Sequence, residues 1–321
     1  MYTLDSQERL EVQRYTEYLQ QVPYNVLPKG LYTSDLLYEQ FDPADPSSFD
    51  RCYDTIAYRH MVETGKVAPK PMETSARSLH DSMISNHMRA FLDQYEQRQV
   101  VGVMGGHAML RSDASYLQTA RVSKRLTEEG YLMISGGGPG AMEATHLGAW
   151  MAGRSLEELQ EAVAILSEAP SFKSEGWLAK SFEVMNRYPQ VSNYESLAIP
   201  TWLYGHEPPA PFATRIAKFF NNSIREDTIL TEAYGGIIYM PGGAGTLQEV
   251  FQEAVQNHYV SLGYPSPMIF VGRKHWTETT PVYPFMEQMI KTGQYRNLIL
   301  ELVDTDEEII SAVMRFNQSA E

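Results

Sequence analysis

Residues 236–249 read Gly-Ile-Ile-Tyr-Met-Pro-Gly-Gly-Ala-Gly-Thr-Leu-Gln-Glu: a short apolar run, a glycine-rich turn and the start of a helical pattern. The run covers residues 236–240, and the helical pattern extends from Thr246 to His258. Glycines in the turn let the backbone approach a ligand closely. The first turn of the following helix presents unpaired N–H groups with partial positive charge. This segment therefore predicts a strand, a turn and a helix that together suit a phosphate group.

The same alternation of apolar runs and helical stretches continues from residue 99 to the end of the sequence. The apolar runs span residues 100–104, 131–135, 162–166, 196–199, 236–240, 268–271 and 298–303. The helical stretches span residues 115–129, 141–152, 211–233, 246–258, 283–292 and 306–316. Strands that are apolar on both faces and lead into helices are typical of a parallel sheet covered on two sides. We therefore expect an α/β fold, a Rossmann-like doubly wound parallel sheet of about seven strands, with ligands beyond the strands' carboxyl ends.

Residues 1–98 have a different sequence pattern, because prolines rather than apolar runs separate the helical stretches there. The helical patterns span residues 4–22, 52–63 and 79–94, and the turn at Pro69 and Pro71 precedes the last of them. We interpret residues 1–98 as a helical N-terminal extension that packs on the main domain. Residues 99–321 are then the Rossmann-like nucleotide-binding domain.

Composition excludes several classes of function. The 321 residues carry 26 Lys and Arg against 40 Asp and Glu, which gives a formal net charge of −14. Docking to a nucleic-acid polymer or an anionic membrane normally needs a basic excess, so we expect neither partner. The single cysteine, Cys52, excludes an intramolecular disulfide framework, and the eight histidines form no metal-binding motif. No apolar stretch resembles a signal peptide or a membrane span, so the sequence predicts a cytoplasmic protein without a metal or redox cofactor.

Three glycine-rich turns follow predicted strands and lead towards helices. They contain Gly105 and Gly106, then Gly137, Gly138 and Gly140, and finally Gly242, Gly243, Ala244, Gly245 and Thr246. Three such turns at one sheet edge suggest a nucleotide. The second turn lacks the third glycine of a dinucleotide fingerprint, and no P-loop motif occurs. The alternative for any single turn is that its glycines only permit a tight bend and close packing of strand against helix.

The segment 241–249, Pro-Gly-Gly-Ala-Gly-Thr-Leu-Gln-Glu, resembles the PGGxGTxxE signature of the LOG-type proteins. Residues 136–144, Gly-Gly-Gly-Pro-Gly-Ala-Met-Glu-Ala, resemble that family's other glycine-rich loop, and the resemblance covers roughly residues 100–303. Members are phosphoribohydrolases, often mislabelled lysine decarboxylases, that cleave a nucleoside 5′-monophosphate to free base and ribose 5-phosphate. The resemblance implies this activity on a nucleotide such as AMP, no cofactor, and a homodimer. Lysine decarboxylation itself would require a lysine for pyridoxal phosphate, and no lysine here has a context that singles it out.

Glu249 is the candidate catalytic carboxylate. Cleavage of an N-glycosidic bond builds positive charge on the ribose, which a carboxylate near C1′ stabilises while it orients water. Glu249 lies one turn into the helix that would hold the phosphate. Thr246 and Glu249 are also spaced as a capping box, in which the glutamate would only bond to the Thr246 backbone N–H. Glu253, one turn further, is a weaker candidate that we expect to be a solvated helix charge.

Arg225 is the candidate for the arginine that the family places upstream of the glycine turn, facing the catalytic glutamate. Such an arginine would bind ribose hydroxyls or phosphate and hold Glu249 ionised. The match is imperfect, because Glu226 replaces the lysine of the family's Arg-Lys pair. Arg215, on the same predicted helix, is the alternative candidate. Arg225 would otherwise be a surface arginine paired with Glu226 or Asp227.

Several other side chains near the predicted edge have open roles. His107 would contact base or phosphate, or be structural; Trp177, Trp202 and Tyr204 would stack on a base, or belong to the core. Residues 206–211 form a proline-rich loop that would act as a lid. Two non-enzymatic functions are alternatives to the hydrolase. One is a nucleotide-sensing module that binds without turnover, which is favoured because Glu226 replaces the family's lysine. The other is an interaction scaffold.

Overall fold

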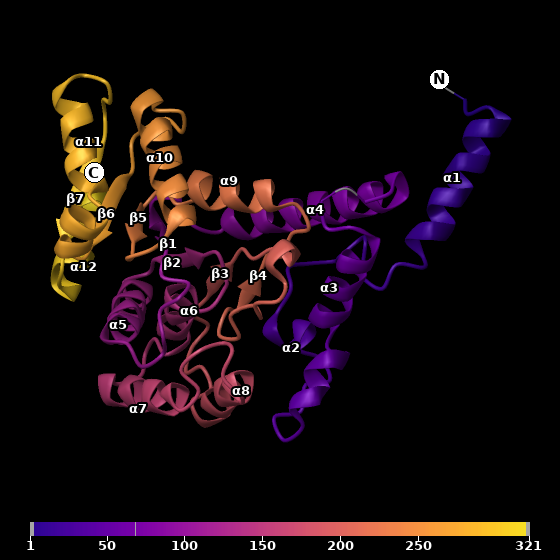
Figure 1. Cartoon of the computed structure of the whole chain (residues 1–321), viewed down its shortest axis with the longest axis horizontal. Helices are drawn as coiled ribbons and strands as arrows, with labels where there is room; N and C mark the ends of the chain where they lie inside the picture. Colours follow the sequence, from indigo (N-terminus) through magenta and orange to yellow (C-terminus); the bar gives the residue numbers. More distant parts are fainter. Residues whose placement is uncertain (1–2, 68, 319–321) are drawn as a thin grey trace.

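The computed structural model describes residues 3–67 and 69–318 and has one seven-stranded parallel sheet at its centre (Figure 1). The strand order is β4-β3-β2-β1-β5-β6-β7, and every neighbouring pair is parallel. The strands are β1 Val100–Met104, β2 Leu132–Ser135, β3 Ser196–Ala198, β4 Arg215–Ile216, β5 Gly236–Tyr239, β6 Pro267–Val271 and β7 Ile299–Val303. The predicted α/β, Rossmann-like doubly wound fold is confirmed.

Helices cover both faces of this sheet. Successive strand residues point to opposite sides, and because both sets are apolar, both faces have to be buried. On one face, Val101 and Val103 pack with residues of α5 Ala114–Glu128 and α12 Asp306–Gln318. On the other face, Val100 and Met104 share a core cluster with residues of several helices. Among these helices are α4 Pro71–Leu92, α9 Asn222–Glu232, α10 Ala244–Tyr259 and α11 Val282–Lys291. Burial on both faces explains why the strands read as continuous apolar runs.

The N-terminal residues form helices that share a core with the sheet rather than a separate one. The elements are α1 Ser6–Leu19, α2 Ser34–Leu37, η1 Pro46–Arg51, α3 Tyr53–Thr64, α4 and η2 Gln97–Gln99. Helix α4 begins at Pro71, earlier than the predicted residue 79, because proline suits the first position of a helix. Helix α1 has no buried residue and projects from the body (Figure 1). No helix in residues 3–67 and 69–318 is long and apolar enough to span a bilayer.

Two predicted elements are wrong. Residues 162–166 lie in α7 Leu156–Ser167, not in a strand, since Ser155 and Glu158 form a capping box that starts a helix. Its apolar residues at helical spacing pack with α6 Ala141–Trp150 and α8 Trp177–Arg187. Residues 211–220 are not helical, because Arg215–Ile216 pairs with β3 and Ile216 also bridges Tyr32. Helix α9 therefore begins only at Asn222, capped by Asn221.

Candidate active site

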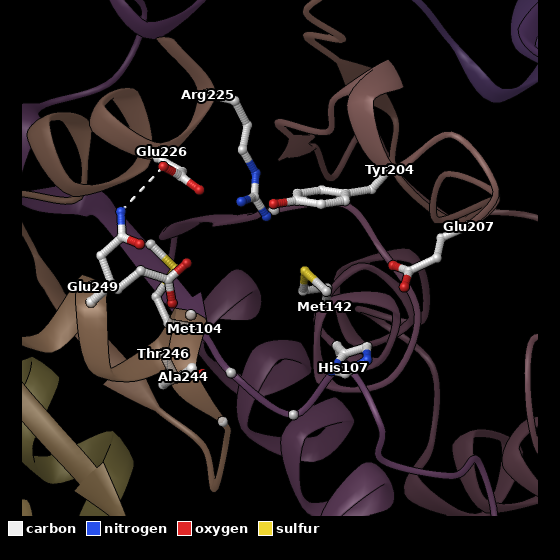
Figure 2. A pocket seen from close by; sticks show the side chains of 16 residues that line it. Met104, His107, Met142, Tyr204, Glu207, Arg225, Glu226, Ala244, Thr246 and Glu249 are labelled. Atoms are coloured by element: carbon white, nitrogen blue, oxygen red, sulfur yellow. Dashed lines mark hydrogen bonds between the residues drawn. The ribbon is translucent and has the colours of Figure 1, made fainter. Parts of the chain in front are cut away.

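A cavity of about 310 Å³ lies beyond the carboxyl ends of β1, β2 and β5 (Figure 2). In this sheet β1 and β5 flank the point where the strand order reverses, which is where ligands of doubly wound folds bind. The walls come from the loops after the three strands, from α6, α9 and α10, and from the segment that contains η3 Trp202–Tyr204. The lining residues are Met104, Gly105, Gly106, His107, Gly136, Met142, Tyr204, Glu207, Arg225, Glu226, Gly243, Ala244, Gly245, Thr246, Gln248 and Glu249.

One end of the cavity is made of backbone. Gly243 is the N-cap of α10 and no side chain caps it, so the first amides of the helix are left for a ligand. Gly105 faces this helix start from β1, with φ +88° and no room for a Cβ beside the Met240 carbonyl. The predicted phosphate-binding residues Gly105, Gly106 and 243–246 thus share one wall. Amides at a helix N-terminus suit a phosphate.

Four of the predicted binding glycines do not line the cavity in the part of the chain that the structure describes: Gly137, Gly138, Gly140 and Gly242. Their positions are explained by packing. A Cβ on Gly140 would strike the Gly106 carbonyl, and one on Gly242 would strike the Thr246 side chain. Gly137 has φ +68° and packs against Ala198. Gly140 and Gly242 thus allow neighbouring turns to approach one another, whereas Gly137 allows close packing against β3.

Glu249 reaches the cavity from the second turn of α10 (Figure 2). The capping-box interpretation is wrong, because the N-cap is Gly243 and Thr246 lies inside the helix. Within residues 3–67 and 69–318 no hydrogen bond reaches the Glu249 carboxylate, which leaves its oxygens available to a ligand. Burial raises the pKa of Glu249 to about 7; the Arg225 charge opposes this rise and the Glu226 charge adds to it.

Arg225 lies on α9 and points into the same cavity (Figure 2). Its Nε donates to the Ile199 carbonyl oxygen at 3.3 Å, which leaves the outer guanidinium nitrogens towards the cavity. The alternative, Arg215, is not on this helix: it lies on β4, where its guanidinium pairs with the Glu195 carboxylate at 2.7 Å. Arg215 does not line the cavity.

Glu226 is a cavity residue that sequence reasoning noticed only as a departure from the family pattern. Its carboxylate accepts a hydrogen bond from the Asn222 amide at 2.6 Å. It accepts a second one from the Gln248 amide at 3.3 Å, the dashed line in Figure 2. The bond from Asn222 lies within α9, and the bond from Gln248 links α10 to α9 at the cavity rim. Gln248 is the residue next to Glu249, so Glu226 helps fix the helix turn that carries Glu249.

The other predicted site residues fall into two groups, those that line the cavity and those that are buried away from it. His107 and Tyr204 line the cavity, as does Glu207 in the predicted lid loop. Trp202 is fully buried, where its indole donates to Asp54 at 2.9 Å, and Trp177 is a buried partner of Arg111. Neither tryptophan lines the cavity.

Glu253 is not a solvated helix charge, because it is 1% exposed and accepts a hydrogen bond from the Ser266 hydroxyl at 2.5 Å. It lies outside the cavity lining. Among the described residues no group of three His, Cys, Asp or Glu side chains is placed to hold a metal ion.

Comparison with known proteins gives one family match. The family described as "possible lysine decarboxylase" matches residues 184–313, a range that includes Arg225, the glycine turn after β5 and Glu249. No curated protein sequence matches the chain. Among solved structures, the molybdenum cofactor binding protein of the phototrophic bacterium Rippkaea orientalis is 13% identical with a TM-score of 0.40, over 68% of this chain and 96% of that chain. The molybdenum cofactor carrier protein of Chlamydomonas reinhardtii is 14% identical with a TM-score of 0.41, over 68% and 98% of the two chains.

Proposed function

The chain belongs to a LOG-like family, and from this premise we propose that it hydrolyses the N-glycosidic bond of a nucleoside 5′-monophosphate such as AMP. Water adds to C1′, the bond from C1′ to the base nitrogen breaks, and its electron pair leaves with the base. The base gains a proton, the water loses one, and the products are free base and ribose 5-phosphate.

The 5′-phosphate would bind where α10 begins. The amides of residues 244–246 and the turn at Gly105 and Gly106 form a concave wall of N–H groups and glycine backbone. Main-chain N–H groups with the partial positive charge of a helix start bind phosphate without a basic side chain. This arrangement fits a chain of net charge −14 that still has to hold an anion.

Glu249 and Arg225 would act on the sugar. Glu249 in its ionised form stabilises the ribosyl cation and orients the attacking water. Arg225 would hold ribose hydroxyls or phosphate oxygens, and its positive charge favours ionised Glu249. The cavity has no lysine among its described lining residues, whereas amino-acid decarboxylation through pyridoxal phosphate needs one.

The observation that carries the proposal is the Glu249 carboxylate, which lies partly buried at the cavity without a hydrogen-bond partner in the described chain, one turn beyond the helix start. Glu249→Gln should lower kcat by roughly 10²–10⁴-fold. Purified protein is incubated with a panel of nucleoside monophosphates, and free base is measured by chromatography. Glu287→Gln, an exposed carboxylate on α11, is the control and should keep full turnover.

A nucleotide sensor is the second candidate, favoured by one observation: Glu226 takes the family's lysine position and adds negative charge to the cavity. A sensor would be stabilised by nucleotide without releasing base, and a ligand at 100 times its Kd adds about 2.7 kcal/mol to the free energy of unfolding. The family resemblance also leads us to propose a homodimer, which light scattering measures directly.

A further inference from the structure

The cavity has a second wall opposite the helix start, and its chemistry differs from that of the phosphate end. Tyr204 at the end of η3, Met142 on α6 and Glu207 in the following loop form it. In Figure 2 the Tyr204 ring and the Met142 side chain lie one above the other, with Arg225 on one side and Glu207 on the other. The Tyr204 side chain is half-exposed, so its ring is open to a ligand.

Glu207 is the unusual member of this wall. Its side chain is only 20% exposed, yet no N–H or O–H of the described chain donates to its carboxylate. Among the described residues, the one basic side chain with a nitrogen within 4 Å of this carboxylate is His206, whose Nε2 lies 3.8 Å from one oxygen, beyond hydrogen-bond distance. The other oxygen lies above the Gly138 backbone, 3.6 Å from the point where a Cβ would stand. A half-buried carboxylate accepts hydrogen bonds only, so this site offers a place for a donor.

The other two acidic side chains of the cavity, Glu226 and Glu249, are not available to this part of the ligand. Glu226 accepts from the side-chain amides of Asn222 and Gln248. Glu249 lies on α10 beside the phosphate end, where the sugar would be. Glu207 is thus the acceptor left for the part of the ligand that is farthest from the phosphate, which in a nucleotide is the base.

We propose that Tyr204, Met142 and Glu207 form the base subsite and that Glu207 selects nucleotides whose base carries an exocyclic amino group. The inference rests on the proposed function. A flat base would stack on the Tyr204 ring, and the polarisable Met142 sulfur would contact its other face. An amino group donates to the Glu207 carboxylate, whereas a carbonyl oxygen in the same position turns lone pairs towards it. Discrimination is strong when the wrong ligand leaves a buried acceptor unpaired.

Matched substrates test this selection. CMP and UMP differ in the amino or oxo group at one ring position and in the proton that the oxo form carries on the adjacent ring nitrogen, and AMP and IMP differ in the same two ways. We expect wild-type kcat/KM to favour CMP over UMP and AMP over IMP, each by roughly 10–100-fold, the size of a charge-assisted hydrogen bond. Glu207→Gln should bring both ratios to within about threefold of one, because an amide both donates and accepts. The change should appear mainly in KM, since the contact does not involve the reacting atoms.

One variant and one stability measurement control the result. His206→Ala removes the side chain that lies 3.8 Å from the Glu207 carboxylate and should leave both ratios unchanged. A thermal unfolding midpoint equal to that of wild type shows that Glu207→Gln is folded. If wild type releases base with CMP/UMP and AMP/IMP ratios near one, the base-subsite proposal is overturned and the hydrolase proposal stands. The same holds if Glu207→Gln keeps the ratios of wild type. If no base is released, the hydrolase proposal fails, and calorimetric Kd values for the same four nucleotides test Glu207 alone. No binding of any of the four overturns both.

Discussion

The Arg225 guanidinium occupies the space in which a side chain at position 136 would stand. A Cβ on Gly136 would collide with Nη2 of Arg225 and would lie 2.9 Å from the Met142 sulfur. The position of the Arg225 guanidinium therefore depends on the absence of a side chain at Gly136, although the two residues are far apart in sequence. Gly136 is required here for space, because its φ lies outside the left-handed region.

Gly136→Ala should lower kcat/KM by about 10–100-fold without unfolding the protein. The alanine displaces the flexible ends of Arg225 and Met142, not backbone, so the fold should persist. Arg225→Ala should have a similar effect, and the double variant should be little worse than either, because both changes remove one interaction. Steady-state kinetics with AMP measures this. Gly30→Ala, where a Cβ meets open space, is the control. Additive losses in the double variant would contradict the coupling.

The protein's pH dependence should report Glu249. Burial raises its pKa to about 7, and catalysis needs the ionised form, so kcat/KM should rise with pH through about 7 and then level. The second phosphate ionisation of the substrate lies near 6 and is common to all variants. Glu226→Gln removes a negative neighbour, so the Glu249 pKa and the midpoint of the profile should move to lower pH. An upward movement, or a profile without a rise, would exclude this role for Glu249.

The sequence predicts one half of the cavity better than the other. Residues 236–249 are a local signal: a buried strand, a glycine turn and a helix start need no distant partner to be recognised. The wall with Tyr204 and Glu207 depends on distant contacts, because the Lys66 ammonium donates to the Leu203 carbonyl and the Tyr38 hydroxyl to the Pro209 carbonyl. No local pattern in residues 202–210 encodes these contacts.

The same limit explains the errors in the elements. Residues 162–166 are apolar whether they form a buried strand or the inner side of a helix, and only the capping box at Ser155 distinguishes the two. Strand β4 has two residues, too few for a periodicity, and its position follows from pairing with β3 and with Tyr32.

Asp81 on α4 should affect catalysis from a distance by holding the start of α9. Its two carboxylate oxygens accept the backbone N–H groups of Phe220 at 3.0 Å and Asn221 at 2.9 Å. His80 Nδ1 lies 2.8 Å from the same carboxylate, and both side chains are buried. Asp81→Asn leaves one oxygen acceptor in place of two, so one backbone N–H loses its partner.

For Asp81→Asn we expect a free energy of unfolding lower by about 1–3 kcal/mol. We also expect kcat/KM lower by about tenfold, because α9 carries Arg225. Urea unfolding and kinetics at a temperature where the variant is fully folded separate the two effects. Asp93→Asn, an exposed aspartate at the end of α4, is the matched control. Lower stability with unchanged kcat/KM would mean that the contact only supports the fold.

Glu253 should make the stability of the protein depend on pH without affecting the reaction. Burial raises the pKa of Glu253 from an ordinary 4.5 to about 7, against the hydrogen bonds from Ser266 and Asn257. The folded state thus binds this proton more tightly than the unfolded state, and stability falls as pH rises from 4.5 through 7. A difference of about 2.5 pKa units corresponds to about 3 kcal/mol at most.

Glu253→Gln removes this titration, because the amide stays neutral. The variant should be more stable than wild type by up to about 1 kcal/mol at pH 5 and by up to about 3 kcal/mol at pH 8. Urea unfolding at pH 5, 6, 7 and 8 gives the difference, in which the shared titration of Glu249 cancels. Glu287→Gln should show a difference that does not change with pH. Base release should survive in Glu253→Gln, since Glu253 lies outside the cavity, whereas it is lost in Glu249→Gln. A loss of turnover in Glu253→Gln would mean that the buried carboxyl, and not only Glu249, takes part in the reaction.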